Sequence, residues 1–158
     1  MRASELEAEF ADMDGWEAES DVSRLIQGLG LSEDILYSEM STLTAKEKVK
    51  VLLAQALFGN PDILMMDEPT NNLDIYHATN MMKIVRRLCD ELGKTVILVL
   101  HEINYAAFYS DYICAFVDGR VAKFGTVREV MNKEVLSKIY NVDFEILEIE
   151  GKPLSIYY

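Results

Sequence analysis

The first third of the chain has the apolar spacing of amphipathic helices. Apolar side chains recur at helical intervals over residues 4–13 and again over residues 21–29, in both cases among many acidic side chains. Further along, Thr44 and Glu47 have the separation of a capping box, in which each side chain satisfies a free backbone amide at a helix start. We therefore expect a helical subdomain over residues 1–58, which ends with the helix that this box begins.

The middle of the chain changes from strand to helix and back to strand. Two short apolar runs, residues 63–66 and residues 96–100, show no polar alternation, which is typical of parallel strands that are covered on both faces. Between them, residues 75–92 carry apolar side chains at helical spacing, and Gly93 provides a helix stop. The order strand, helix, strand predicts a parallel strand pair in an α/β fold.

The last third predicts antiparallel strands. Residues 112–117 and 120–124 flank the dipeptide Asp118-Gly119, which tolerates the positive φ angles of a tight hairpin turn. We assign this region and the parallel pair to a second subdomain, residues 59–158. The elements expected after the hairpin are two short helices, over residues 126–132 and 133–140, and two strands, over residues 144–149 and 154–157, joined by residues 151–153.

The charge is strongly acidic and unevenly placed. The chain has 158 residues, of which 50% are apolar, and a net charge of −12. Residues 1–42 hold eleven acidic side chains against two basic ones, a net of −9. Such a surface is repelled by phosphate backbones, so we expect no direct nucleic-acid binding. No apolar run approaches the ~18 residues of a membrane helix, and the acidic amino terminus lacks a signal-peptide core, so we expect a cytoplasmic protein.

The candidate chemistry follows the first apolar run. Two adjacent carboxylates, Asp67 and Glu68, end that run and are followed by Pro69. An acidic pair in this position is usually a polar turn. A rigid strand would also hold Asp67 where it can help bind Mg²⁺ and Glu68 where it can polarise an attacking water. The phosphate-loop pattern Gly-x-x-x-x-Gly-Lys-Ser/Thr does not occur among the eight glycines of the sequence.

This segment resembles the Walker B strand and D-loop of ABC-type ATPases, and the chain resembles the second half of such a cassette from about residue 4 onward. The resemblance implies a partial P-loop NTPase fold with a helical subdomain, a parallel strand pair and carboxyl-terminal antiparallel strands. It implies that Asp67 binds Mg²⁺, that Glu68 orients water and that Asp74 communicates across a dimer. His101, 33 residues after Glu68, matches the switch histidine that contacts the γ-phosphate; a lone histidine is more often structural.

The run Leu43, Thr44, Ala45, Lys46 and Glu47 occupies the place of the family's signature sequence Leu-Ser-Gly-Gly-Gln. In the family, backbone amides at this helix start approach the γ-phosphate that the opposite subunit holds. Ala45 and Lys46 replace both glycines, which restricts close backbone approach, although Thr44 keeps the hydroxyl and Lys46 adds a positive charge. An ordinary capped helix is the alternative interpretation.

The two parts of the chain resemble different branches of the family. The first part contains Met13-Asp14-Gly15-Trp16 and Gln27-Gly28-Leu29-Gly30. With these runs, residues 1–74 resemble the second cassette of the soluble ABC-F group, whose members act on ribosomes. The second part contains Val99-Leu100-His101-Glu102 and Tyr109-Ser110-Asp111-Tyr112. With these runs, residues 76–158 resemble the ATPases of iron-siderophore importers. The two branches share a motif near Asp74. Recombination within this motif would keep the two parts in register, so the pattern indicates a hybrid cassette.

The resemblance implies ATP and Mg²⁺ as cofactors, both bound weakly or not at all by the isolated chain. It implies as partners another cassette or a complementary segment that carries Walker A, and a membrane permease, which would place the chain at the inner face of the plasma membrane. Unpaired strand edges also predict self-association. The first functional hypothesis is ATP hydrolysis coupled to iron-siderophore import, inactive in this chain alone. The alternatives are a non-enzymatic cassette remnant or fusion module, and an ABC-F type ribosome-associated ATPase fragment.

Overall fold

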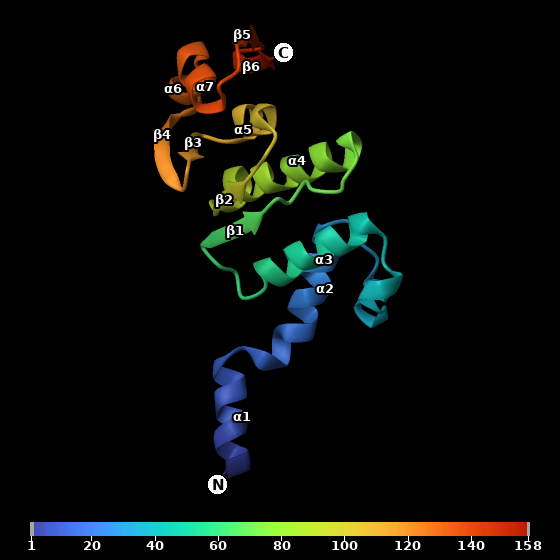
Figure 1. Cartoon of the computed structure of the whole chain (residues 1–158). Coiled ribbons are helices and arrows are strands. Elements are labelled where there is room, and N and C mark those ends of the chain that lie inside the picture. The colour runs from blue at the N-terminus through green and yellow to red at the C-terminus, as the bar shows by residue number, and fades with distance from the viewer. Residues whose placement is uncertain (1, 158) are drawn as a thin grey trace.

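The computed structural model describes residues 2–157, and its amino-terminal third is helical as expected (Figure 1). Helix α1 lies at one end of the molecule and projects from it, and α3 lies against the first strand region. The segment between α2 and α3 forms two short 3₁₀ turns. The elements are α1 (Arg2–Asp12), η1 (Gly15–Glu17), α2 (Ala18–Gly28), η2 (Glu33–Tyr37), η3 (Met40–Thr42) and α3 (Ala45–Leu57).

The parallel strand pair is confirmed. Strand β1 (Ile63–Asp67) pairs with β2 (Thr95–Val99), and α4 (Ile75–Leu92) connects them. The boundaries of both strands differ from the expected ones by one residue. Gly93 ends α4 in the left-handed conformation (φ 63°), and its N–H donates to the carbonyl of Cys89 at 3.1 Å. The glycine supplies a backbone conformation that a side chain would make costly.

The expectation that this pair is covered on both faces is wrong. Alternate residues of a strand point to opposite faces, and only one face here meets the core. Leu64 is buried, and Met66, Val96 and Leu98 pack beside it. The other face is open, with exposed fractions of 59% at Ile63, 76% at Met65, 48% at Ile97 and 50% at Val99. The covering elements α2, α3 and α4 all contribute to the same core, which leaves the second apolar face without a layer.

The main core forms where α2, α3, α4 and β1 meet. Its buried members are Ile26, Leu29, Leu53, Ala54, Leu57, Leu64, Met81, Val85 and Leu88. Leu53 is 1% exposed, whereas its neighbour Leu52 on the same helix is 54% exposed. The two leucines therefore share a helix and a chemistry but differ in burial.

Leu53→Ala is expected to lower the free energy of unfolding by about 3 kcal/mol, because it removes buried methyl groups and leaves a cavity. Leu52→Ala is the matched control and is expected to change the free energy of unfolding by less than about 0.5 kcal/mol. Urea denaturation of both variants and the parent measures the difference. Equal losses at the two positions would contradict the described core.

The carboxyl-terminal part contains two antiparallel hairpins. Asp118 (φ 50°) and Gly119 (φ 72°) form the expected tight turn of the first hairpin. The second hairpin differs from expectation, because its turn is Glu150-Gly151 and the strand already begins at Lys152. The elements are α5 (Ile103–Tyr109), β3 (Tyr112–Val117), β4 (Arg120–Thr126), α6 (Val127–Val130), α7 (Lys133–Tyr140), β5 (Phe144–Ile149) and β6 (Lys152–Tyr157).

Polar contacts fix this part against α4 and α5. Arg86 on α4 donates from Nη1 to Asp111 Oδ2 at 2.8 Å and from Nε to Asp90 Oδ1 at 2.9 Å. These hydrogen bonds, that of Asp90 first, raise the pKa of Arg86 above its ordinary value. Asn104 on α5 accepts the N–H of Ser155 at 2.8 Å and donates to the Ser155 carbonyl at 3.1 Å.

None of the helices among the described residues combines the length and the apolar character that spanning a membrane requires.

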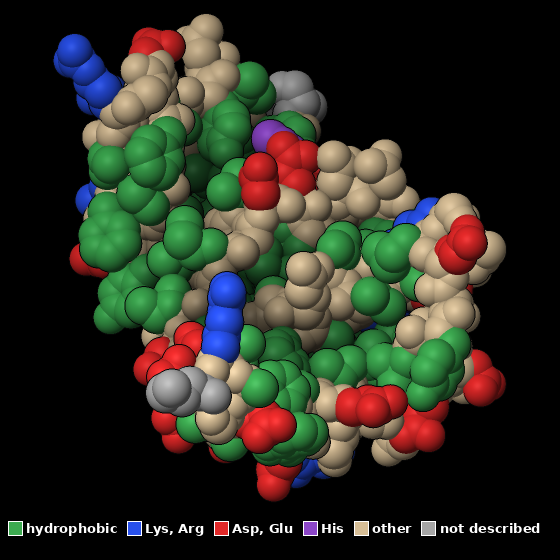
Figure 2. Space-filling model, turned by 90° about the horizontal axis from the view of Figure 1, so that it is seen from below, with side chains coloured by type: hydrophobic (Ala, Val, Ile, Leu, Met, Phe, Trp, Pro, Cys, Tyr) green, Lys and Arg blue, Asp and Glu red, His purple; other side chains and the backbone are tan. Residues whose placement is uncertain are grey.

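The open face of β1–β2 predicts self-association of the isolated chain. Figure 2 shows hydrophobic side chains gathered on the left, the side where Figure 1 places the β3–β4 hairpin and β1. Unpaired strand edges next to exposed apolar side chains favour contact with another molecule. Sedimentation velocity over a range of concentrations is expected to show species larger than the monomer.

A charged residue on the open face tests the cause of this association. Met65→Lys is expected to shift the distribution toward the monomer, because a Lys ammonium resists burial at an apolar contact. Tyr37→Lys changes an equally accessible residue on η2, 83% exposed, and is expected to leave the association unchanged. A compact monomer at every concentration of the parent chain would contradict the prediction.

Candidate active site at the ends of β1 and β2

The two parallel strands end side by side. Asp67, the last residue of β1, is paired with Val99, the last residue of β2. The N–H of Glu68 donates to the Val99 carbonyl at 3.1 Å, so the strand pairing continues one residue past β1. Parallel strands present their carboxyl ends at one edge of the sheet, where ligands bind in open α/β folds. Residues that follow β1 and β2 therefore meet at this edge.

The carboxylate of Glu68 is held from two sides. Its Oε1 contacts Nε2 of His101, two residues beyond β2. Its Oε2 accepts a hydrogen bond from Nδ2 of Asn71 at 2.8 Å. The side chain of Glu68 is 33% exposed and that of His101 is 75% exposed. The carboxylate is therefore fixed in orientation and still reachable by a ligand, which are the properties that a group needs to orient water or accept a proton.

The backbone of Glu68 is unusual for a residue with a side chain. Its φ angle is 46°, in the left-handed region that favours glycine. The next residues form a tight turn, in which the N–H of Asn71 donates to the Glu68 carbonyl at 3.0 Å. This turn places the amide of Asn71 beside the carboxylate. A strained conformation at the end of a strand is typical of functional sites.

Asp67 presents a second carboxylate at the same edge. Its residue is exposed, and among the described residues no hydrogen bond or ion pair engages its side chain. Within the same residues there is no group of three or more His, Cys, Asp or Glu side chains suited to a metal ion. Mg²⁺ in phosphoryl-transfer sites is bound by one or two carboxylates together with substrate phosphates. Asp67 is therefore suited to a Mg²⁺ site that is completed by substrate phosphates, and not to a site made of protein side chains alone.

Asp74 caps the helix that follows the turn. Its Oδ1 accepts the N–H of His77 at 2.8 Å, which satisfies a free amide at the start of α4. Its Oδ2 lies 3.8 Å from Nε2 of His77. A pocket of about 550 Å³ opens between this part of the chain and α5, with Thr70, Leu73, Glu102 and Tyr105 among its lining residues.

The residues in the place of the signature sequence form the expected capping box. Thr44 Oγ1 accepts the N–H of Glu47 at 3.3 Å, and Glu47 Oε2 accepts the N–H of Thr44 at 2.9 Å. Glu47 Oε2 also accepts the Thr44 hydroxyl at 2.7 Å, and this hydrogen bond holds the pKa of the Glu47 carboxyl below its usual value. The carboxylate places a negative charge at the helix start, where a phosphate would need positive potential.

The structure brings some of the expected site residues together and leaves others apart. Glu68 and His101 are in contact, and Asp67 precedes Glu68 at the same strand end. Among the described residues, no hydrogen bond or ion pair joins the first turn of α3 to either of them. Asn71 was missed in the sequence. The available signal was an amide side chain three residues after an acidic one, in a turn rich in asparagine.

The profile of the ABC transporter family matches residues 2–71. The petrobactin import ATP-binding protein YclP of Bacillus subtilis is 36% identical over 126 residues, which cover 80% of this chain and 50% of the relative. The iron(3+)-hydroxamate import ATP-binding protein FhuC of the same organism is 33% identical over 137 residues, covering 84% of this chain and 50% of the relative. The uncharacterized ABC transporter ATP-binding protein YkpA, also of Bacillus subtilis, is 49% identical over 105 residues, covering 66% of this chain and 19% of the relative.

Solved structures of ABC transporter components have a fold similar to that of this chain. The inward-facing structure of a putative metal-chelate type ABC transporter superposes with a TM-score of 0.79 at 17% identity, over 88% of this chain and 57% of that one. The dimeric post-hydrolysis ATP-binding cassette MJ0796, bound to ADP and Pi, gives a TM-score of 0.59 at 30% identity, over 66% of this chain and 45% of that one. The chain spans about half the length of the import proteins that it matches. In family profile, relatives and fold, the chain is similar to the ATP-binding domains of ABC transporters.

Proposed function

We propose that this chain carries the hydrolytic part of an ABC-type ATPase. In this proposal Glu68 orients the attacking water, Asp67 helps hold Mg²⁺ against the triphosphate, and His101 contacts the γ-phosphate. The observation that carries the proposal is the Glu68 carboxylate, which Asn71 and His101 hold at the end of two parallel strands. ATP and Mg²⁺ are the cofactors that the family implies.

The geometry suits the chemistry of phosphoryl transfer. Such reactions need a nucleophile in line with the γ-phosphate and compensation of the charge on its oxygens. Because both oxygens of Glu68 have a partner, the carboxylate does not have to be ordered when a water binds beside it. His101 leaves most of its ring accessible beside that carboxylate, so it can reach a phosphate there. Bound Mg²⁺ would supply the remaining neutralisation of phosphate charge.

The proposal requires a phosphate loop from another segment. A triphosphate is normally held by a nest of backbone amides and a lysine, and that pattern does not occur in this sequence. We propose that a second cassette or a complementary segment with Walker A supplies it, and that the chain alone is inactive. In a pair of cassettes, Asp74 and the first turn of α3 would face the partner. The dimeric ATP-binding cassette structures among the similar proteins support this arrangement.

The biological process proposed here is the import of an iron-siderophore through a membrane permease. The support is the likeness to relatives named for petrobactin and iron(3+)-hydroxamate import. We also propose that the chain is a hybrid whose first part is of ABC-F type. The support is the sequence pattern of the two parts, which resembles one branch of the family before Asp74 and another after it. Comparing residues 1–74 and 76–158 separately tests this, and equal identity of both parts to one relative would contradict it.

One observation favours a non-enzymatic remnant as the second candidate. The capping box at Thr44 and Glu47 uses the hydroxyl that would face a phosphate and adds a carboxylate beside it. Ala45 and Lys46 also lack the freedom of the glycines that the family has there. A chain with this helix start would keep the fold without completing a catalytic dimer. The acidic first 42 residues, with a net of −9, disfavour a ribosome-associated role.

Phosphate release by a grafted domain separates the two candidates. Residues 43–104, which contain the first turn of α3 together with β1, α4, β2 and His101, would replace the matching segment of an intact ABC ATP-binding domain. If the proposal is correct, the graft hydrolyses ATP, because the segment supplies every hydrolytic group that we assign. A folded graft that binds ATP without hydrolysing it would favour the remnant.

A further inference from the structure

Helix α1 presents an apolar row that the rest of the chain does not cover. Leu6, Phe10 and Met13 follow one another at intervals of four and three residues, so they lie on one face of the helix and its last turn. None of the residues of α1, all of which are described, is buried. The helix packs against the short helix η1, and Figure 1 shows it extending away from the other elements.

An aromatic pair gives this surface a fixed shape. The rings of Phe10 and Trp16 meet edge to face, with centroids 4.9 Å apart and planes at 90°. Gly15 lies against the Phe10 ring, and a Cβ at that position would clash with the ring. Asp14, with φ 55°, turns the chain so that Trp16 folds back onto the helix. The turn is thus built around the Phe10 ring even though no core holds it.

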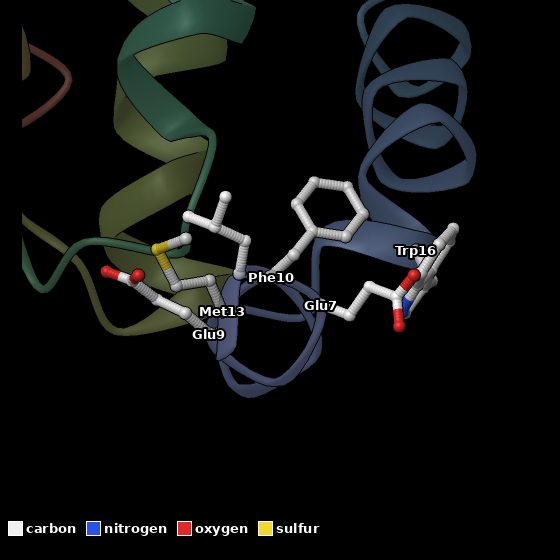
Figure 3. Close-up of a pocket in the computed structure, with 6 residues that line it drawn as sticks. Glu7, Glu9, Phe10, Met13 and Trp16 are labelled. Atoms are coloured by element: carbon white, nitrogen blue, oxygen red, sulfur yellow. The ribbon is translucent and has the colours of Figure 1, made fainter. Parts of the chain in front are cut away.

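The pair and its neighbours line a shallow pocket of about 540 Å³ (Figure 3). Trp16 is 73% exposed and Met13 is 67% exposed, so large apolar groups face water. Figure 3 shows the carboxylate of Glu7 on the Trp16 side and that of Glu9 on the Met13 side. An apolar patch with a charged rim is typical of a surface that binds another protein.

The charge around the pocket restricts the kind of partner. Residues 2–17 contain six acidic side chains and one basic one, a net of −5. A second copy of this surface would bring like charges together, which disfavours pairing of α1 with itself. Anionic membranes and nucleic acids are repelled for the same reason. A basic partner is attracted, and its apolar groups gain from leaving water at the pocket.

We propose that α1 and η1 form a docking site for a basic amphipathic helix of a partner protein. The apolar face of that helix covers Phe10, Met13 and Trp16, and its lysines or arginines pair with Glu7 and Glu9. Binding of an amphipathic helix to an apolar surface is a common mode of recognition, in which apolar side chains about one turn apart on the helix make the main contacts. The exposed aromatic pair provides the kind of residue on which binding free energy concentrates.

The single tryptophan of the chain is a built-in reporter for this test. The whole chain is titrated with a synthetic helical peptide of about 18 residues, in which leucines at helical spacing form one face and lysines the other. We expect a saturable blue shift of Trp16 emission, because the peptide covers a ring that is now exposed. Raising the salt concentration is expected to weaken binding, because exposed charges are screened.

Variants locate the binding to this surface. Phe10→Ala is expected to weaken peptide binding at least tenfold, and Glu7→Gln combined with Glu9→Gln is expected to weaken it most at low salt. Leu52→Ala is the control, since Leu52 is a similarly exposed apolar residue on α3. Because α1 contributes nothing buried, circular dichroism of the variants should match the parent. Met13→Ser provides a second test that leaves the aromatic pair intact.

Three results would overturn the proposal. Equal binding of a scrambled peptide with the same composition would show attraction by charge alone. A blue shift that depends on protein concentration without peptide would identify a second copy as the occupant. A blue shift with vesicles of anionic phospholipid, and none with the peptide, would identify a membrane surface.

Discussion

Replacing Glu68 by glutamine is expected to lower ATP turnover by two to four orders of magnitude in an intact domain that carries residues 43–104. Glutamine keeps the volume of the side chain and an oxygen for Asn71, but it cannot take a proton from water. Nucleotide binding should persist, because Glu68 is assigned to the water and not to the phosphates. Phosphate release and equilibrium ATP binding, measured on the same preparation, separate the two effects.

Glu91→Gln serves as the matched control for this result. Glu91 also lies within the grafted segment, and its carboxylate pairs with Arg87 on the surface of α4. Its loss removes the same charge and is expected to leave turnover unchanged. If Glu68→Gln hydrolyses ATP as fast as Glu91→Gln, the assignment of Glu68 is wrong. If Glu68→Gln loses ATP binding as well, Glu68 acts in binding.

The 158-residue chain by itself is expected to bind Mg-ATP no more tightly than about 1 mM, or about −4 kcal/mol, and to hydrolyse it negligibly. In the proposed mechanism, Asp67, Glu68 and His101 act on a nucleotide that another segment already holds in place. Without a phosphate loop, a triphosphate lacks the backbone amides and the lysine that neutralise it. The net charge of −12 adds repulsion. Titration calorimetry of the purified chain measures the affinity directly.

A comparison with Glu68→Gln in the same purified chain makes this prediction sharp. Slow phosphate release that survives the substitution is background. Release that the substitution abolishes, or micromolar affinity, would show that the fold builds a phosphate site from residues not assigned here. Adding a segment that contains Walker A is expected to raise affinity, because it restores the missing amides and lysine.

Local chemistry explains which elements the sequence predicts correctly. The capping box at Thr44 and Glu47 and the turn at Asp118-Gly119 depend on residues a few positions apart, and both form as expected. The cover over β1 and β2 is different. Their apolar runs favour burial on both faces, but burial depends on whether another layer is present, which the runs themselves do not encode. Met65 and Ile97 are accordingly exposed.

The candidate site was predictable to the extent that topology fixes it. Parallel strands end at one edge, so the approach of Glu68 to His101 follows from their places after the two strands. The contact with Asn71 could not be predicted in this way. It depends on the left-handed turn at Glu68, which hydrophobic periodicity does not indicate, and its one local signal is the amide three residues after Glu68 in an asparagine-rich turn. The roles of Asp74 and of the first turn of α3 depend on a partner surface and stay predictions.

Because the backbone at Glu68 is left-handed, engineering this chain for thermal resistance conflicts with its proposed function. Glycine and asparagine adopt this conformation more readily than glutamate, so Glu68→Gly or Glu68→Asn would relieve local strain. A screen that rewards only heat tolerance would therefore tend to discard the carboxylate on which we expect hydrolysis to depend. Directed evolution of this chain should hold position 68 fixed and seek added stability elsewhere.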